Sequence, residues 1–266
     1  MRGCGRPLTR LDRRFACDVG HSFDVARTGY LNLLQPDDRK SLEAGDAKGA
    51  VEARARLLDA GAGRALIGVL RRIVQARPLL PGTVVLDLGS GSGHHLAALA
   101  ETSPIVGVGI DLSTAAASLA ARRYPHLTWL VANADRRLPI LDRSVDVVLS
   151  VHGRRHPLEC ARVLSPRGHL VVCVPAPDDL VELREAVLGG RVERDRTAAV
   201  IAEHDALFTL TERLEARHRQ RFEPAALRDL LAGTYRGERF SQDSRLQTLA
   251  ALDVTLASDV LVFAPR

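Results

Sequence analysis

Short apolar runs alternate with stretches of helical spacing through the middle of the chain. The apolar runs predict β-strands at residues 84–88, 105–110, 127–131, 145–151 and 169–174. The stretches between them have apolar positions three or four residues apart, which predicts helices, the first of them beginning near Ser92. Strands that alternate with helices join into parallel sheets, so this order predicts a mostly parallel, doubly wound α/β fold.

Helical spacing also occurs before the first of these strands and after the last. Residues 51–76 place their apolar positions on one face, and Gly61 and Gly63 predict a break between two helices. FEPAALRDLLAG (residues 222–233) predicts another helix. The final stretch, LDVTLASDVLVFAPR, predicts two short strands across a turn, which would form an antiparallel hairpin that closes the sheet.

This pattern divides the chain into three parts. Residues 1–35 are rich in turn residues and predict a small head. Residues 36–80 predict a linker with helices, because their first part is polar and their second part has helical spacing. Residues 81–266 predict one large domain, and the full length of 266 residues is sufficient for such a domain with an appendage.

The turn after the first predicted strand carries the strongest chemical pattern. In VVLDLGSGSGHH (residues 84–95), Gly89, Gly91 and Gly93 occupy alternate positions, where a ligand can approach the backbone closely. Asp111 ends the next strand, and its carboxylate can accept hydrogen bonds from both hydroxyls of a ribose. The third glycine comes one residue earlier than in a dinucleotide site.

With Asp87 just before the turn, this pattern resembles the S-adenosylmethionine (SAM) site of class I methyltransferases. The resemblance implies that Asp87 helps to hold the methionine end, that the glycines pass beneath the cofactor, and that Asp111 binds its ribose. The alternative is a plain strand–turn–helix connection that needs glycine for its geometry alone.

Composition narrows the class of protein further. Hydrophobic residues make up 46% and charged residues 26%, as in ordinary globular proteins. No apolar run approaches the roughly 20 residues that span a bilayer. The beginning, MRGCGRPLTRLDRRF, is basic but lacks the apolar core of a secretory signal. We therefore expect a cytoplasmic protein that does not act in a membrane.

The charge balance allows a nucleic-acid partner without requiring one. The net charge is +5, from 37 Lys and Arg against 32 acidic residues, and nearly all the bases are Arg. Arginine binds phosphates through two hydrogen bonds, which suits a polyanion. A solvated surface, or an arginine bias from genomic composition, explains the same numbers. Aromatic residues are only 4% of the chain, which argues against a broad base-stacking platform.

The head contains three residues of the types that bind zinc. Cys4, Cys17 and His21 resemble part of a zinc ribbon whose full form is C-x2-C-x12-C-x3-H. The position of the first cysteine is Met1 in this chain. The fourth ligand would then be water, a residue from elsewhere or a residue of a longer N-terminus. In the alternative interpretation, the two cysteines are small packing residues.

Three segments follow the zinc-like pattern in a recognisable order: GHSFDVARTGYLNLLQ (20–35), EARARLLDAG (52–61) and the SAM pattern through VPAPDDLVELR (174–184). Together they resemble the bacterial 23S rRNA guanine-N1 methyltransferases, some of which protect producing organisms from macrolide antibiotics. The resemblance implies zinc in the head and methyl transfer to N1 of a guanine. It also implies 23S rRNA or the large ribosomal subunit as partner, with homodimers among the members.

The resemblance implies one set of cofactor-binding residues: Arg54, Asp87, Gly89, Gly91, Gly93, His94, His95, Asp111, Leu112 and Asn133. The chain departs from the family on the substrate side. The family's "GHY" is replaced by residues 61–63, and its "FAPR" by residues 152–155, of which only the Arg matches. Cofactor binding is therefore better supported than the identity of the substrate.

The end of the fourth predicted strand supplies a candidate catalytic residue, His152. It lies at the carboxyl edge of the sheet, where doubly wound folds bind ligands, and it could accept the N1 proton of guanine. The alternative is a histidine without a chemical role. Arg154 and Arg155 beside it, with Arg13 and Arg14 in the head, are candidates for contacts to RNA phosphates, or else a solvated charge run.

Two other functions stay open on the sequence. The substrate-side departures and the incomplete zinc set favour a small-molecule methyltransferase of secondary metabolism. The other alternative is a protein that binds SAM or RNA without catalysis. The complete cofactor pattern favours an enzyme over this last alternative.

Overall fold

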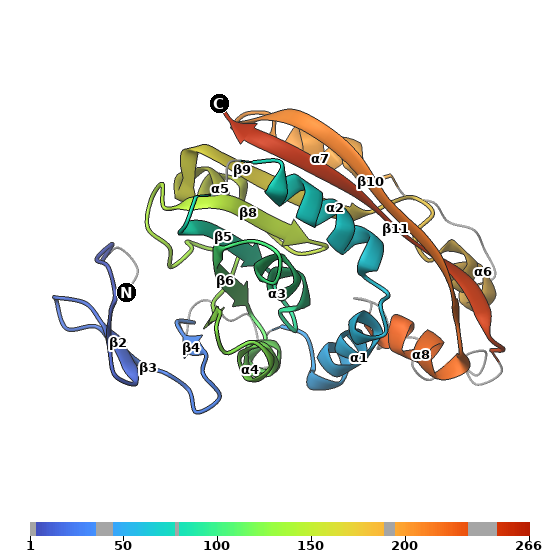
Figure 1. The fold of residues 1–266 in the computed structure, drawn as a ribbon, viewed down its shortest axis with the longest axis horizontal. Helices are drawn as coiled ribbons and strands as arrows, with labels where there is room; N and C mark the ends of the chain where they lie inside the picture. The colour runs from blue at the N-terminus through green and yellow to red at the C-terminus, as the bar shows by residue number, and fades with distance from the viewer. Residues whose placement is uncertain (1–3, 36–44, 78–79, 189–194, 234–248) are drawn as a thin grey trace.

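The computed structural model describes residues 4–35, 45–77, 80–188, 195–233 and 249–266. Most of them surround one eight-stranded sheet with strand order β10-β11-β9-β8-β5-β6-β7-β4 (Figure 1). Its strands in chain order are β4 (Leu31–Asn32), β5 (Thr83–Leu88), β6 (Ile105–Asp111), β7 (Thr128–Val131), β8 (Val145–Val151), β9 (Leu164–Pro175), β10 (Phe208–Phe222) and β11 (Leu252–Pro265). The head has a separate sheet of β1 (Thr9–Leu11), β2 (Arg14–Ala16) and β3 (Ser22–Asp24).

Helices cover both faces of the large sheet. Their bounds are α1 (Lys48–Asp59), α2 (Arg64–Gln75), α3 (His94–Ala100), α4 (Thr114–Arg123), α5 (Pro157–Val163), α6 (Val181–Leu188), α7 (Thr197–His204) and α8 (Pro224–Ala232). One hydrophobic cluster joins the sheet to α2, α3 and α4, and another joins it to α5 and α7. The predicted break at Gly61 and Gly63 is confirmed, because α1 ends at Asp59 and α2 begins at Arg64.

The six strands from β4 to β9 are parallel, which confirms the predicted doubly wound sheet. The chain builds outward from β5 through β6 to β7 and then returns to place β8 on the other side of β5. The strand order therefore reverses at β5. In folds of this kind, ligands bind beyond the carboxyl ends of the strands at such a reversal.

The closing hairpin is present, but our prediction of its strands was wrong. Residues 252–265 form one continuous strand, β11, which pairs antiparallel with both β9 and β10. Ser258 and Asp259, polar residues in the middle of this stretch, lie inside the strand. Asp259 is buried there because Thr197 and Arg213 donate hydrogen bonds to its carboxylate. The sequence resembled a turn because the partners of these polar residues are far away in the chain.

The head is joined to the main sheet by β4, a strand too short to predict from its sequence. Leu31 pairs with Leu130 at the outer edge of the large sheet. Phe15 and Phe23 of the head's own strands also pack against the core cluster that contains Leu31. In Figure 1 the head lies at one end of the molecule, and α6 and α8 lie at the other.

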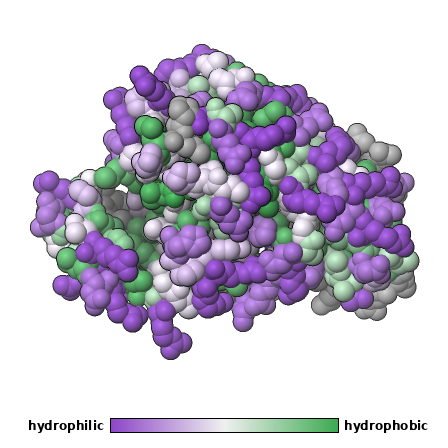
Figure 2. Space-filling model, in the orientation of Figure 1, coloured by the Kyte–Doolittle hydropathy of each residue, from purple (hydrophilic) through white to green (hydrophobic). Residues whose placement is uncertain are grey.

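A third, smaller hydrophobic cluster lies under α1, α6 and α8 and includes Leu57, Leu183 and Leu227. Cys160 and Cys173 are buried in the core on both sides of the sheet. None of the helices in the described part of the chain is long and apolar enough to cross a membrane. Hydrophilic residues cover most of the face seen in Figure 2, with apolar residues in scattered groups.

Candidate active site

The glycine turn follows β5 and requires glycine at all three positions. The φ angles of Gly89, Gly91 and Gly93 are 73°, 54° and 80°, in the left-handed region that side chains disfavour. A Cβ atom at Gly93 would also lie 2.4 Å from Cη2 of the buried Trp129 ring. The turn is thus kept close to β6, where the Gly89 and Ser90 amides both donate to the Ile110 carbonyl.

Asp111 ends β6 and connects that strand to the glycine turn. Its two carboxylate oxygens accept hydrogen bonds of 2.8 Å, Oδ2 from the Gly91 amide and Oδ1 from the Ser113 amide. Burial raises the pKa of Asp111 above its ordinary value, because it outweighs these two hydrogen bonds, which lower the pKa. Each oxygen has a further lone pair, so the carboxylate can also accept from two ribose hydroxyls.

Asp87 lies at the end of β5 and is 1% exposed. Neither of its carboxylate oxygens has a hydrogen-bond partner among the described residues. Burial, and then the charge of Asp111, raise the pKa of Asp87 to about 7. An unpaired buried carboxylate is costly unless a ligand compensates it. The ammonium group of a bound methionine moiety would do so, and the site therefore fits the SAM that the sequence predicts.

Arg54 reaches the same turn from α1, although it lies far from β5 in the sequence. Its Nη1 lies 4.0 Å from the position of a Cβ at Gly91. Nη1 also donates to Asp46 Oδ2 at 2.8 Å, and Nη2 donates to the Gly233 carbonyl at 2.7 Å. Asp46 in turn accepts a hydrogen bond from the Ser113 hydroxyl through its carbonyl. The structure thereby places Arg54 beside the predicted cofactor residues.

Three other predicted residues lie around this edge. His95 follows the turn, and burial together with neighbouring positive groups lowers its pKa to about 3, so the ring is neutral. Leu112 is half-buried directly after Asp111. Asn133 lies beyond the carboxyl end of β7, where its Oδ1 accepts from the Asp135 amide at 2.9 Å. Their roles toward a cofactor stay predictions.

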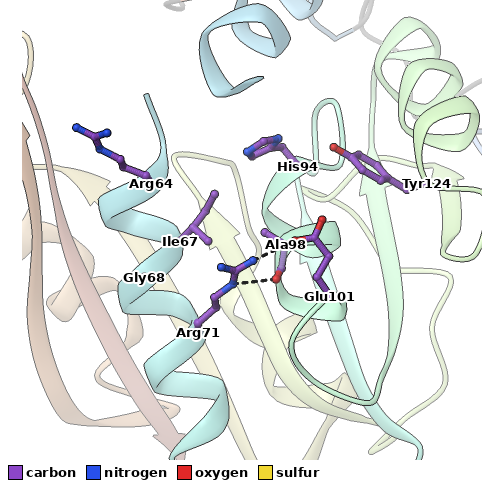
Figure 3. A pocket seen from close by; sticks show the side chains of 8 residues that line it. All are labelled: Arg64, Ile67, Gly68, Arg71, His94, Ala98, Glu101 and Tyr124. Atoms are coloured by element: carbon purple, nitrogen blue, oxygen red, sulfur yellow. Dashed lines mark hydrogen bonds and ion pairs between the residues drawn. The ribbon is translucent and has the colours of Figure 1, made fainter. Parts of the chain in front are cut away.

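His94 differs from the other candidates because it lines a hollow of about 250 Å³ between α2 and α3. Figure 3 shows its ring above α3, near Tyr124, with Arg64 and Arg71 on the facing helix. None of the other predicted cofactor residues lines this hollow. Burial lowers the pKa of His94, and its Nδ1 has no hydrogen-bond partner among the described residues.

His152 follows directly after β8 and has a φ of 52°, which is unusual for a residue with a side chain. Its Nε2 lies 2.9 Å from the Ser258 hydroxyl of β11. The surrounding protein, and then the charge of Arg54, lower the pKa of His152 to about 4. The imidazole is therefore neutral at pH 7 and able to accept a proton.

The two arginines after His152 have different surroundings. Arg154 is exposed and forms a 3.0 Å ion pair with Asp135, which connects the loops that follow β8 and β7. The side chain of Arg155 is only 9% exposed and faces inward, to His204 and Glu203 of α7. A contact between Arg155 and RNA is a prediction that this inward orientation does not favour.

Sequence analysis missed several residues of this edge, including Asp46, His204 and Ser258. Each has at least one partner more than 45 positions away in the chain, a contact that no local pattern marks. Arg136 and Arg137, which are exposed on the loop after β7, were also missed. Their position shortly after the predicted strand at residues 127–131 was a usable signal, since that loop lies at the carboxyl edge of the sheet.

The head brings its three predicted metal ligands together. The ligand atoms of Cys4, Cys17 and His21 all lie within 4.8 Å of one another, and Cys17 Sγ is 3.3 Å from His21 Nδ1. Desolvation alone would raise the pKa of Cys17, but hydrogen bonds to His21 and to the backbone outweigh it and lower that pKa to about 7. Two thiols and an imidazole in this geometry suit zinc. Arg13 and Arg14 are exposed on the same small sheet.

Comparisons with known proteins agree with the assignment of both the methyltransferase domain and the zinc-binding head. Residues 85–168 match the family model "Methyltransferase domain", and residues 4–42 match "RlmA, N-terminal", a zinc ribbon. The YcgJ protein of Bacillus subtilis has a solved structure with a TM-score of 0.51 to this chain at 16% identity, covering 75% of this chain and 98% of that one. This likeness shows the fold alone.

Two curated relatives are similar over most of their length. The 23S rRNA (guanine(748)-N(1))-methyltransferase of Streptomyces fradiae is 40% identical over 205 residues, or 75% of this chain and 71% of the relative. A Micromonospora griseorubida protein with a provisional 23S rRNA guanine-N1-methyltransferase name is 36% identical over 74% of this chain and 72% of that relative. With its SAM-dependent methyltransferase fold and zinc-ribbon head, this chain belongs to the family of 23S rRNA (guanine-N1)-methyltransferases.

Proposed function

We propose that this protein transfers a methyl group from SAM to N1 of a guanine in 23S rRNA. One observation carries the proposal: the buried, unpaired Asp87 and the bridging Asp111 flank a glycine turn in a chain 40% identical to an enzyme named for that reaction. The residues that we propose to hold the cofactor are those around this turn.

Methyl transfer to guanine N1 requires the protein to bind the cofactor, to hold the guanine in line with the methyl group, and to remove the N1 proton. Bound SAM supplies an electrophilic methyl group and leaves as the neutral thioether. We propose that Nδ1 of His152, the ring nitrogen that does not face Ser258, accepts the guanine proton. Its low pKa keeps the ring neutral at pH 7, so that a ring nitrogen is available to take up the proton.

RNA binding is supported by arginines on the carboxyl edge of the sheet. Arg136 and Arg137 are exposed on the loop after β7. Arg154, on the loop after β8, reaches the same loop through its ion pair with Asp135. We propose that these three contact phosphates beside the target base, while Arg13 and Arg14 in the head contact a more distant part of the hairpin. Loops and unpaired bases are the usual targets of such sequence-specific RNA recognition.

The test is to incubate the protein with methyl-tritiated SAM and three acceptors: naked 23S rRNA, assembled large subunits and a small-molecule extract. Labelled rRNA is then digested and mapped by mass, and N1 methylation is located by the reverse-transcription stop that it causes. We expect a single labelled guanine and no label with the Asp111→Ala variant.

Label in the extract alone would contradict the proposal and favour a small-molecule methyltransferase. Tight SAM binding without label in any acceptor would favour a binding protein. Macrolide resistance and assembly into homodimers, which the family resemblance implies, and action in the cytoplasm, which the composition favours, stay predictions. Drug sensitivity of a host with and without the active protein tests the first of them.

A further inference from the structure

The loop between β8 and α5, residues 152–156, lies directly on the cofactor turn. A Cβ atom at Gly153 would come within 2.7 Å of the Leu88 carbonyl, and a Cβ at Gly89 would lie 3.4 Å from the Gly153 Cα. The two backbones are thus in close contact. Any shift of this loop therefore moves His152 relative to the glycine turn.

The first end of the loop is held by the central and C-terminal strands. The His152 amide donates to the Cys173 carbonyl of β9 at 3.0 Å, and its Nε2 is 2.9 Å from the Ser258 hydroxyl of β11. These contacts keep the left-handed backbone at His152, a conformation that costs free energy and needs support from its surroundings.

The second end is anchored by Arg155. Its Nε donates to His204 Nε2 at 3.1 Å, and its Nη2 forms a 3.0 Å ion pair with Glu203. Burial lowers the pKa of Arg155, yet the planar guanidinium stays charged and keeps both bonds in one plane. A lysine could not make both contacts with this geometry.

His204 is fully buried and has one usable orientation. Its Nδ1 lies 2.7 Å from the Val200 carbonyl, which can only accept, so Nδ1 carries the proton and Nε2 is free to accept from Arg155. The ring also stacks on Phe263 of β11, with 5.2 Å between centroids. The anchor is therefore rigid, because packing and hydrogen bonds fix the same ring.

We propose that Arg155 and His204 are positioning residues, which fix the loop 152–156 so that His152 stays beside the cofactor turn. Neither needs to touch RNA. The expected effect on methyl transfer rests on the proposed function. The effect on the position of the His152 ring does not, because it can be observed without an RNA substrate.

The kinetic test compares Arg155→Lys, His204→Phe and the double variant. Arg155→Lys keeps the charge but loses the planar pair of bonds, and His204→Phe keeps the aromatic packing but removes the acceptor. We expect kcat to fall about tenfold in each, with the KM for RNA and its salt dependence unchanged, because a displaced group slows chemistry rather than binding. The double variant should be no worse than either single variant, since both break one interaction.

If Arg155 instead contacts a phosphate of the RNA, the variants should give the opposite result. Lysine would then largely restore kcat, while Arg155→Gln would raise the KM for RNA and reduce its salt dependence. That result, or additive losses in the double variant, would overturn the proposal. Glu203→Gln separates the two contacts of Arg155, because it weakens only the ion pair with a half-exposed residue, so kcat should fall less than in either single variant.

A second measurement is independent of the reaction. The 15N and 1H shifts of the His152 ring should form one sharp set in the wild type, and should move or broaden in Arg155→Lys and in His204→Phe while the fold is retained. Unchanged ring signals would overturn the positioning role even if methyl transfer is confirmed. If the ring signals change but the protein methylates no RNA, the positioning role of Arg155 and His204 is supported and the proposed function is contradicted.

Discussion

The two sides of this active site are built from contacts between residues at very different separations in the sequence. On the cofactor side, Asp111 binds Gly91, 20 positions away, and Ser113, two positions away. On the opposite side, His152 meets Ser258 across 106 positions, and Arg155 meets His204 across 49. The cofactor side is thus a local strand–turn–helix unit, whereas the substrate side exists only when the whole chain is folded.

This difference predicts that substitutions on the two sides of the active site impair different functions. A change in the local unit should affect SAM binding first, and a change in the long-range contacts should affect transfer or RNA binding while SAM still binds. The following changes test that separation, beginning with the largest expected effect.

Gly93→Ala should damage the cofactor side most. The residue has a φ of 80°, and its Cβ would lie 2.4 Å from the Trp129 ring, so the turn and the ring cannot both stay in place. We expect the free energy of unfolding to fall by about 3 kcal/mol and SAM affinity to fall at least 100-fold. Urea unfolding and calorimetry measure the two effects.

Gly61→Ala is the matched control for this change. Gly61 has a similar φ of 86°, but nothing lies within 4 Å of its Cβ position. Only the backbone strain applies there, so we expect a loss of about 1 kcal/mol and unchanged SAM affinity. Equal losses in the two variants would contradict the role given to the contact with Trp129.

Acid should weaken SAM binding through Asp87. Its pKa of about 7 means that lowering the pH protonates the carboxylate and removes its attraction for the cofactor's ammonium group. Below pH 7, the Kd for SAM should rise by up to about tenfold per pH unit. The raised pKa has the opposite effect on the free protein, whose stability should fall as the pH rises from about 4, the ordinary pKa of aspartate, to about 7. Calorimetry across this range, with Asp87→Asn as a variant expected to bind weakly and without this pH dependence, measures the effect. A wild-type affinity that does not change with pH would contradict it.

The double variant Arg136→Gln/Arg137→Gln should affect only the substrate side. Each arginine that neutralises a phosphate of single-stranded RNA adds about 0.7 to the salt slope of binding, so we expect the slope to fall by about 1.4. The KM for RNA should rise severalfold, with SAM affinity unchanged.

The control Arg143→Gln/Arg167→Gln removes the same charge at the opposite edge. Both residues are exposed, Arg143 just before β8 and Arg167 near the beginning of β9. The salt slope should barely change in this variant. Equal effects of the two double variants would mean that RNA responds to net charge rather than to the carboxyl edge.

The same difference in range explains what the sequence could predict. The glycine turn, Asp111 and the parallel order of strands follow from patterns within about 30 residues, and the structure has them where they were expected. The single strand β11 was missed because the partners of Asp259, Thr197 and Arg213, lie in other elements. The inward orientation of Arg155 was missed for the same reason, since a buried acceptor on α7 decides it.

The head is an intermediate case. Its Cys and His spacing predicted a ligand cluster, and the structure brings Cys4, Cys17 and His21 together. Its attachment to the large sheet through β4 could not be predicted, because two residues paired with β7 carry no periodic pattern.

The central claim is that the edge between β5 and β6 binds SAM, with Asp111 accepting hydrogen bonds from the ribose. Calorimetric titration of SAM into the wild type and into Asp111→Asn tests it most directly. The amide can still accept a backbone hydrogen bond but lacks the charge, and a charge-assisted hydrogen bond is worth about 1.5–3 kcal/mol. We predict one SAM per wild-type chain and an affinity about 10- to 100-fold lower in the variant. No heat with the folded wild type, or equal affinity in the two proteins, would contradict the account.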